Sequence, residues 1–300
     1  MIGRGVLATL TLLGVVPFAG DGALRVWRDD RWVPWFRADS APTRWPGPLP
    51  TVADGVVWAP VTEGIELGRL RLSGSGEAWR VGVVIARIDP RVVRWRLVWG
   101  MGEGDRKSWT IDRADSGVRI ALNAGMFTGG GPFGWTVIDG EERGVVGSGA
   151  LAPAFVVDSA GDVSLVPAES LWSRAHQGKV ALAFQSYPEL LHGEGDVPPM
   201  LRAGATAIDL THRDARLAIG QLRDGKWLIA LTRFEGAGGA LSFLPFGLTV
   251  PEMAALMGAL GCRRAVSLDG GVSAQLRVGT ERWPGLRKVA LGLEIVRSER

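Results

Sequence analysis

The stretch LTVPEMAALMGALGCRRAVSLDGG, residues 248–271, predicts a helix, a stop and a strand that ends in a single acid. Thr249 and Glu252 have the spacing of a capping box, and Pro251 falls in the first turn of the helix. Gly261 is a typical C-terminal stop. Between these ends, apolar side chains recur on one helix face, at Met253, Leu256, Met257 and Leu260. We therefore expect a packed helix followed directly by a buried strand.

The strand carries Asp269 to its end, and two glycines follow at once. Gly270 and Gly271 permit positive φ angles and a close approach to the backbone, and Ser273 adds a small hydroxyl. Free amides there would receive an anion, such as a phosphate or the charge that develops on a sugar oxygen. The alternative is a glycine turn in which Asp269 makes a turn hydrogen bond. In α/β architectures the carboxyl end of a strand is where ligands bind, which favours a functional carboxylate here.

A second apolar strand, IALNAGMF at residues 120–127, also ends in one polar side chain. Asn123 is the only asparagine in the chain, and Gly125 lies close behind it. An amide both donates and accepts hydrogen bonds, which suits a sugar hydroxyl, although asparagine more often caps a turn. The GGGPFG run at 129–134 spells a dinucleotide-binding pattern, but Pro132 and the absence of a following helix break that context. We interpret it as a mobile glycine loop beside the site.

Strand patterns and hairpin turns dominate the rest of the chain. Asp-Gly pairs, the strongest short hairpin signal, lie between β-rich arms at Asp139-Gly140 and Asp224-Gly225. Other expected elements are strands at 79–89 and 94–100 and short helices near 109–116 and 167–176. We predict an α+β (mixed α/β) fold: a single domain with a large, mostly antiparallel sheet content, hairpins and few helices.

Residues 1–23 have the layout of a signal peptide or an N-terminal anchor, because Arg4 precedes an apolar run over residues 6–19. The run is short for a membrane span, which needs ~20 apolar residues. We expect an exported protein, periplasmic or extracellular, that meets a membrane only through this segment if it is not cleaved. Residues 24–56 hold Pro, Trp and mixed charge without periodicity, which predicts a linker or a wrap. The main domain is expected at 57–297.

The composition excludes several functional classes. A net charge of +3 without a basic stripe is not typical of a nucleic-acid-binding protein. The single cysteine, Cys262, excludes an internal disulfide and zinc sites built on several thiolates. The histidines, which are His176, His192 and His212, are not closely paired. We expect no cofactor: acidic and amide groups near Asp269 could hold calcium, but no oxygen-ligand spacing is visible.

The order of these motifs resembles that of the phosphodiester glycosidase family. The resemblance rests on blocks that span most of residues 57–296, namely ALNAGMF (121–127), PFGWTVIDGE (132–141), AFQS (183–186), ARLAIGQLRDGKWLIAL (215–231) and LTVPEMAALMGALGCRRAVSLDGGVSAQL (248–276). The chain departs from the family pattern at Val272, Ser273 and Ala274, where relatives often have a third glycine and paired serines. It also has Tyr187 where relatives commonly have glycine.

The resemblance implies a hydrolase that splits a sugar-1-phosphodiester into a free sugar and a phosphomonoester. It implies Asp269 and Asn123 as the catalytic residues, with Asp269 as the carboxylate and Asn123 orienting the sugar or phosphate. It implies Arg216 as a bidentate phosphate clamp, the alternative being a surface arginine of a strand. The other implied substrate-binding residues are Gln185, Ser186, Gly125, Gly270, Gly271 and Ser273. Ordinary glycosidases use two carboxylates. Glu141 and Asp209 are candidates for the second, although an acidic phosphate leaving group could make one carboxylate sufficient.

Two other functions stay open at this point. The chain could be a non-catalytic protein that binds glycans or glycan phosphates, with its chemistry lost at the altered positions. It could also be a structural envelope protein that holds a partner through its tryptophan-rich segment at 24–56. Turnover would separate the hydrolase from both, and glycan binding would separate the second function from the third.

Overall fold

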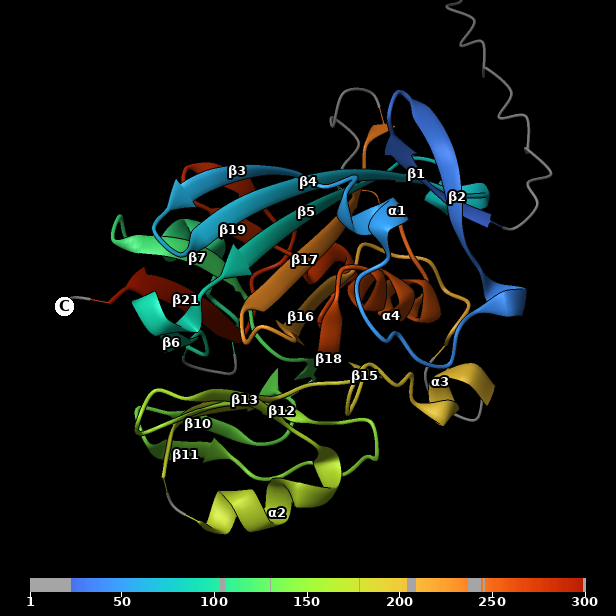
Figure 1. Cartoon of the computed structure of the whole chain (residues 1–300). Helices are drawn as coiled ribbons and strands as arrows, with labels where there is room; N and C mark the ends of the chain where they lie inside the picture. Colours follow the sequence, from blue (N-terminus) through green and yellow to red (C-terminus); the bar gives the residue numbers. More distant parts are fainter. Residues whose placement is uncertain are drawn as a thin grey trace, which may run out of the picture.

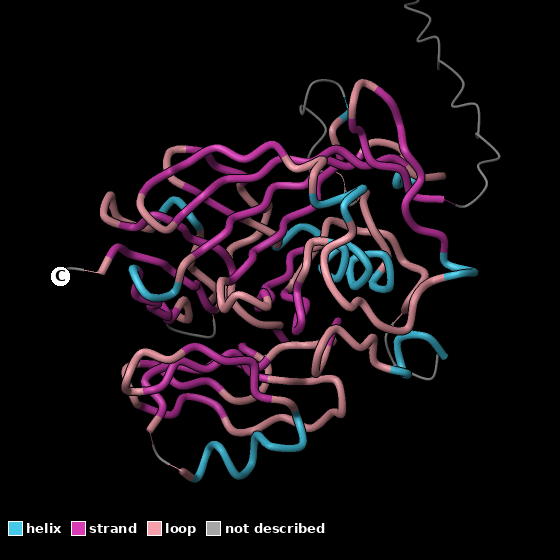
Figure 2. The backbone as a smooth tube through the Cα atoms, viewed as in Figure 1, coloured by secondary structure: helices cyan, strands magenta, loops and turns pink. Residues whose placement is uncertain are grey.

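Antiparallel pairing organises the whole chain. The computed structural model describes residues 23–102, 106–129, 131–177, 179–203, 209–236, 244 and 246–298. Within these ranges every pair of named strands is antiparallel, and only two helices, α2 (Ala168–His176) and α4 (Val250–Ala259), are longer than five residues. Strands accordingly dominate the backbone trace in Figure 2. The predicted antiparallel sheet content with few helices is confirmed, and the fold is richer in strand than an even α+β mix.

The large sheet has nine strands, in the order β15-β18-β16-β17-β5-β4-β1-β2, with β3 also paired to β4 (Figure 1). Its strands are β1 (Ala23–Arg28), β2 (Arg31–Arg37), β3 (Val57–Thr62), β4 (Ile65–Ser73), β5 (Val81–Ile88), β15 (Glu189–Leu191), β16 (Leu217–Leu222), β17 (Trp227–Phe234) and β18 (Cys262–Leu268). The β16–β17 hairpin turns at Asp224-Gly225, as predicted, and Gly225 has a φ of +87°.

The second sheet has the order β20-β19-β7-β21-β6 and the third sheet the order β11-β10-β14-β12-β13. The second sheet comprises β6 (Val93–Trp99), β7 (Val118–Asn123), β19 (Leu276–Val278), β20 (Glu281–Trp283) and β21 (Leu291–Arg297). The third sheet comprises β10 (Thr136–Ile138), β11 (Glu141–Gly144), β12 (Ala154–Asp158), β13 (Val163–Val166) and β14 (Val180–Gln185). A two-residue turn at Asp139-Gly140 joins β10 to β11, which confirms the second predicted hairpin.

The remaining elements are short. They are the strands β8 (Phe127–Thr128) and β9 (Gly131–Pro132), which pair with each other, and the helices α1 (Pro50–Ala53) and α3 (Pro199–Ala203). The helix predicted at 167–176 is α2. The one expected near 109–116 is wrong, since this segment contains only a 3-10 turn, Ile111–Arg113. Trp109 and Ile111 are buried against the second sheet there, so their apolar character serves packing and not a helix face.

The central strands of the large sheet, β5, β16 and β17, are buried on both faces. One face packs on α4, whose ten residues all have little exposure except Pro251, so the helix is enclosed all round and not only on the predicted face. The other face shares a core with the second sheet and with the inner side of the third sheet, through residues such as Ile219, Leu293 and Phe155. The third sheet and α2 form the lowest layer in Figure 1. The predicted capping box at Thr249 and Glu252 begins α4.

The prediction of a linker or wrap at residues 24–56 did not foresee the strands that the structure has in the first part of this segment. β1 and β2 form a hairpin at the edge of the large sheet, and Leu24 and Val26 are buried in the core below α4. A bulge between Leu24 and Arg25 breaks the strand periodicity, and Pro34 is tolerated because β2 is an edge strand. The sheet therefore begins at Ala23 and not near residue 57. The segment predicted as a signal peptide or anchor lies almost wholly outside the described residues.

Residues 38–56 wrap along α4. Trp45 is buried and its ring lies against Gly258, and the Leu49 N–H donates to the Ala259 carbonyl at 2.8 Å. A Cβ at Gly258 would overlap the Trp45 ring. This glycine is therefore required by the close approach of the wrap and not by the helix.

We expect Gly258→Ala to lower the free energy of unfolding by about 1 kcal/mol, because overpacking against Trp45 outweighs the higher helix propensity of alanine. Urea denaturation followed by circular dichroism measures the change. In a Trp45→Ala background the ring is gone, so Gly258→Ala should then stabilise the protein. If Gly258→Ala has the same effect in both backgrounds, the packing of the wrap on α4 is not what requires the glycine.

Candidate active site

The side chain of Asn123 joins the ends of two strands from different sheets. Its Nδ2 donates to the Asp269 carbonyl at 2.9 Å, and its Oδ1 accepts the Gln275 N–H at 3.0 Å. The Asp269 N–H donates in turn to the Gly125 carbonyl at 2.9 Å. Asn123 is wholly buried, so its amide is a part of the framework that fixes the backbone of Asp269. The two polar strand ends that the sequence singled out are therefore brought together.

The glycines after Asp269 are required by a neighbouring turn. The Gly271 N–H donates to the Ala215 carbonyl at 2.8 Å, and a Cβ at Gly270 would lie 2.5 Å from that same carbonyl oxygen. Gly271 has a φ of +56°, and a Cβ there would lie 2.6 Å from Oδ2 of Asp214. The amide of Gly271, expected to receive substrate, thus has a partner within the protein. The two positions lack side chains because residues 214–215 pack on them.

Asp269 is a buried carboxyl with mixed charges around it. Burial raises the pKa of this carboxyl above its ordinary value, while a hydrogen bond from the Ser273 side chain and the positive charge of Lys107 act against the rise. The negative charge of Asp214 raises the pKa further, and the positive charge of Arg287 lowers it. Ser273, predicted to be at the site, therefore contacts Asp269. Lys107 and Arg287 were not predicted.

Asp214 is a second carboxyl beside Asp269. Its Oδ1 accepts the Ala215 N–H at 2.8 Å, and its Oδ2 lies 3.7 Å from Nε2 of the exposed His212. Burial raises the pKa of Asp214 as well, against the backbone hydrogen bond from Ala215 and the charge of Arg216. Two partly desolvated carboxyls that repel each other are a common arrangement in hydrolytic sites.

The two acids considered earlier for the second carboxyl have other roles. Glu141 lies on β11 of the third sheet, where it is exposed and pairs with Arg143 at 2.5 Å. Asp209 accepts the backbone N–H groups of Thr211 and His212 at 2.9 and 3.1 Å, and so closes the turn that leads to His212. Asp214 is the acid next to Asp269, and the sequence reasoning missed it.

Arg216 holds the turn that carries Asp214. Its Nε donates to the Leu248 carbonyl at 2.8 Å and its Nη2 to the His212 carbonyl at 2.5 Å. Burial lowers the pKa of this guanidinium, against the charges of Asp214, Glu252 and Asp209. These contacts use two of the five N–H groups of the guanidinium and tie it to the backbone at residues 212 and 248. We therefore assign Arg216 to positioning Asp214, and its contact with phosphate stays a prediction.

Gln185 and Ser186 belong to the framework. The Gln185 Oε1 accepts the N–H groups of Trp135 at 3.0 Å and Gly147 at 2.8 Å, and its Nε2 donates to the carbonyls of Gly147 at 2.9 Å and Ala152 at 2.8 Å. All of its hydrogen-bonding groups are thus engaged. The Ser186 hydroxyl, also buried, donates to the Ser267 carbonyl at 2.6 Å. Both side chains therefore hold the protein's own backbone, and their contact with substrate stays a prediction.

Loops and a short hairpin surround the candidate site. Gly125, two residues after Asn123, has a φ of +70°, and the short β8–β9 hairpin follows it. Lys107 lies 5.2 Å from the ring centroid of Phe127, which places its ammonium beside this hairpin. Phe133 meets Tyr187 edge to face at 4.9 Å, so the residue that replaces the family's glycine packs on the glycine-rich segment. The mobility predicted for residues 129–134 stays a prediction.

No group of three or more His, Cys, Asp or Glu side chains within the described ranges is arranged to hold a metal ion. In the same ranges no helix is long and apolar enough to cross a membrane. The expected absence of a cofactor stays a prediction.

The comparison with family models gives a match to phosphodiester glycosidase over residues 116–296, which include Asn123, Asp214 and Asp269. The chain belongs to the phosphodiester glycosidase family. No curated protein matches it.

Solved structures share the fold at low identity. The catalytic domain of zebrafish N-acetylglucosamine-1-phosphodiester alpha-N-acetylglucosaminidase, auto-inhibited by its pro-peptide, has a TM-score of 0.57 and 15% identity, with 82% of each chain covered. A hypothetical protein from Synechocystis has a TM-score of 0.53 and 16% identity, covering 92% of this chain and 68% of the other.

We expect Asn123→Ala to lower the free energy of unfolding by about 2 to 5 kcal/mol, because it leaves a buried carbonyl and a buried N–H unpaired. Urea denaturation measures the change. The matched control is Gln221→Ala, which removes a half-buried amide that accepts one hydrogen bond from Arg263 at 3.0 Å. Equal, small effects of the two substitutions would contradict the framework role of Asn123.

Proposed function

We propose that this family member is a hydrolase that cleaves the bond between a sugar and a phosphodiester, releasing free sugar and a phosphomonoester. The observation that carries the proposal is the pair of partly buried carboxyls, Asp269 and Asp214, with the cations of Lys107 and Arg287 close to Asp269. The carboxyls supply proton transfer, and the cations supply charge for a phosphodiester anion.

The chemistry assigns each group a role. Lys107 and Arg287 would bind the non-bridging oxygens of the phosphodiester and hold the anomeric carbon above Asp269. Asp269, as a carboxylate, would take a proton from a water molecule while the water oxygen bonds to the anomeric carbon. The bond from that carbon to the phosphate oxygen breaks, and its electron pair stays on the phosphate. Because this leaving group is already acidic, it needs no strong general acid.

Asp214 would tune Asp269. Its negative charge raises the proton affinity of Asp269, which makes Asp269 a stronger base for the water. Ser273 donates to the Asp269 carboxyl side chain and would keep it oriented. The raised pKa of Asp269 means that the base form is lost on acidification at a higher pH than for an ordinary aspartate.

The cellular setting belongs to the same proposal. The apolar run at residues 6–19 is the reason for placing the protein outside the cytoplasm, where it would act on glycans of the envelope or on exported polysaccharide. A carbohydrate or glycan phosphate would then be its partner, with no role for nucleic acid.

We expect Asp269→Asn to lower turnover by about 100-fold or more, since it removes the base and leaves the size of the side chain unchanged. The assay follows reducing sugar released from a panel of sugar-1-phosphodiesters that includes UDP-N-acetylglucosamine. Glu141→Gln, an exposed acid of the third sheet, is the control and should turn over normally. Full turnover by Asp269→Asn would contradict this mechanism. If the wild type binds glycans but shows no turnover, the protein is better described as a non-catalytic binding protein.

We expect Asp214→Asn to shift the acidic limb of the kcat/KM profile to lower pH. The like charge of Asp214 raises the pKa of Asp269, so removing it lets Asp269 remain a base in more acidic solution. The asparagine Oδ1 can still accept the Ala215 N–H, so the local geometry should survive. An unmoved acidic limb, with activity merely scaled down, would give Asp214 a structural role only.

A further inference from the structure

A groove separate from the candidate active site lies between β3 and the β19–β20 hairpin. Its volume is about 560 Å³, within the usual range for small-molecule sites. Val61 of β3 packs against Gly279 in the hairpin turn, and this contact joins the two walls. Arg119 of the groove is the second residue of β7 and Asn123 is the last, which separates the two regions by about 13 Å along that strand.

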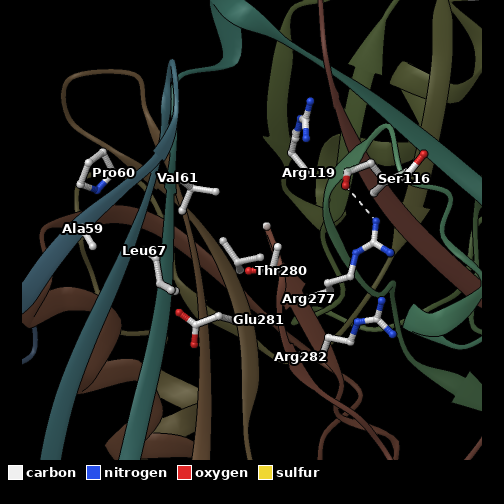
Figure 3. A pocket seen from close by; sticks show the side chains of 13 residues that line it. Ala59, Pro60, Val61, Leu67, Ser116, Arg119, Arg277, Thr280, Glu281 and Arg282 are labelled. Atoms are coloured by element: carbon white, nitrogen blue, oxygen red, sulfur yellow. Dashed lines mark hydrogen bonds between the residues drawn. The ribbon is translucent and has the colours of Figure 1, made fainter.

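The two walls of the groove differ in chemistry. Figure 3 shows Pro60, Val61 and Leu67 on one side and the side chains of Arg119, Arg277 and Arg282 on the other. The hydroxyl-bearing residues Ser116 and Thr280 also line it. An apolar wall opposite a cationic wall fits a ligand with a carbon-rich face and an anionic group.

Arg277 places a fixed positive charge in the basic wall. This residue is 5% exposed, and its two terminal nitrogens donate to the backbone carbonyls of Ala114, Asp115 and Val118 at 2.7 to 2.8 Å. Among the described residues no carboxylate forms an ion pair with it, and its buried Nε has no hydrogen-bond partner. Burial and the charge of Arg282 lower the pKa of Arg277, while the negative charges of Glu294, Asp115 and Asp112 act against this.

The two outer arginines are available to a ligand. Arg282 pairs with Asp112 at 3.1 Å, but both side chains are more than half exposed, and such surface pairs are weak and easily exchanged. Arg119 is exposed, and within the described ranges no acid pairs with it. The carboxylate that lines the groove, Glu281, is already paired with Arg69 outside the lining. The groove therefore keeps an excess of positive charge.

We propose that this groove binds an anionic saccharide, with its phosphate or carboxylate group on Arg119 and Arg282 above Arg277, and a sugar ring against Pro60 and Val61. Guanidinium groups bind both kinds of oxyanion through charge-assisted hydrogen bonds, and the C–H face of a sugar ring packs on apolar side chains. The inference does not rest on the hydrolytic function, because the groove holds neither Asp269 nor Asp214.

The test is an NMR titration of the ¹⁵N-labelled full chain with inorganic phosphate, glucose 6-phosphate, glucuronate and neutral glucose. We expect the amide signals of Arg119 and of residues 279–282 to shift with glucose 6-phosphate, glucuronate or both, and not with glucose. Tighter binding of one of the two anionic sugars shows whether the groove prefers a phosphate or a carboxylate group. If inorganic phosphate binds more weakly than glucose 6-phosphate, the sugar ring contacts the apolar wall. None of these probes is a sugar-1-phosphodiester, so the result is independent of turnover.

Two matched double variants distinguish a specific anion site in the groove from nonspecific electrostatic binding to the protein surface. Arg119→Ala/Arg282→Ala should weaken binding at least tenfold, whereas Arg31→Ala/Arg202→Ala removes the same charge from exposed positions elsewhere and should change it less than twofold. Equal loss in both double variants, shifts confined to signals near Asp269, or no shift with either anionic sugar would overturn the proposal. Arg277 is left intact because its removal would free three carbonyls and could unfold the loop.

Discussion

The hydrogen bonds of one buried amide hold the candidate site together. Asn123 ends β7 in the second sheet, and Asp269 follows β18 in the large sheet, so the two residues belong to different layers. The amide of Asn123 bonds the backbone of Asp269 on one side and that of Gln275 on the other. A side chain that can donate and accept at once is needed here, which explains why the chain keeps its only asparagine at this position.

These hydrogen bonds fix the backbone of Asp269, and the groups around its carboxyl determine how readily it holds a proton. Burial disfavours the charged form, and the nearby acid Asp214 adds to that effect. Ser273, Lys107 and Arg287 partly restore the charged form, so the carboxyl is balanced between its two states. The glycines at 270 and 271 make this possible, because any side chain there would displace the turn that carries Asp214.

Several features could be predicted from local patterns because their causes are local. The capping box of α4 and the Asp-Gly hairpins depend on residues a few positions apart, and they are where the sequence puts them. The β1–β2 hairpin was not predicted, because a bulge and an edge proline interrupt the alternation of apolar and polar residues that marks a strand. The backbone contacts of Gln185 and Ser186 could not be predicted, because a polar side chain at a strand end looks the same in a sequence whether it meets a ligand or a backbone.

The position of Asp214 beside Asp269 could not be predicted from the sequence alone. Leu217 of β16 pairs with Leu268 of β18 in antiparallel register, so the residues before β16 lie beside those after β18. This register brings Asp214 to Gly271, 57 positions along the chain, whereas parallel strands would have put the two at opposite ends of the sheet. The argument that ligands bind at the carboxyl ends of strands comes from parallel α/β sheets and does not apply to this antiparallel sheet, so the catalytic role of Asp269 stays a prediction.

The sequence by itself determined that Asp269 would end a buried strand after a capped helix, with no side chains on the next two residues. It also determined the antiparallel, hairpin-rich character of the fold. The tertiary structure decided which groups surround that acid: a second carboxyl, a lysine and an arginine, each from a different loop. It also decided that three arginines distant from that acid would line one groove together with apolar residues of β3 and β4. The physical reason is that strand ends and turns follow from neighbours in sequence, whereas the electrostatics of a site follow from neighbours in space, which only register and packing bring together.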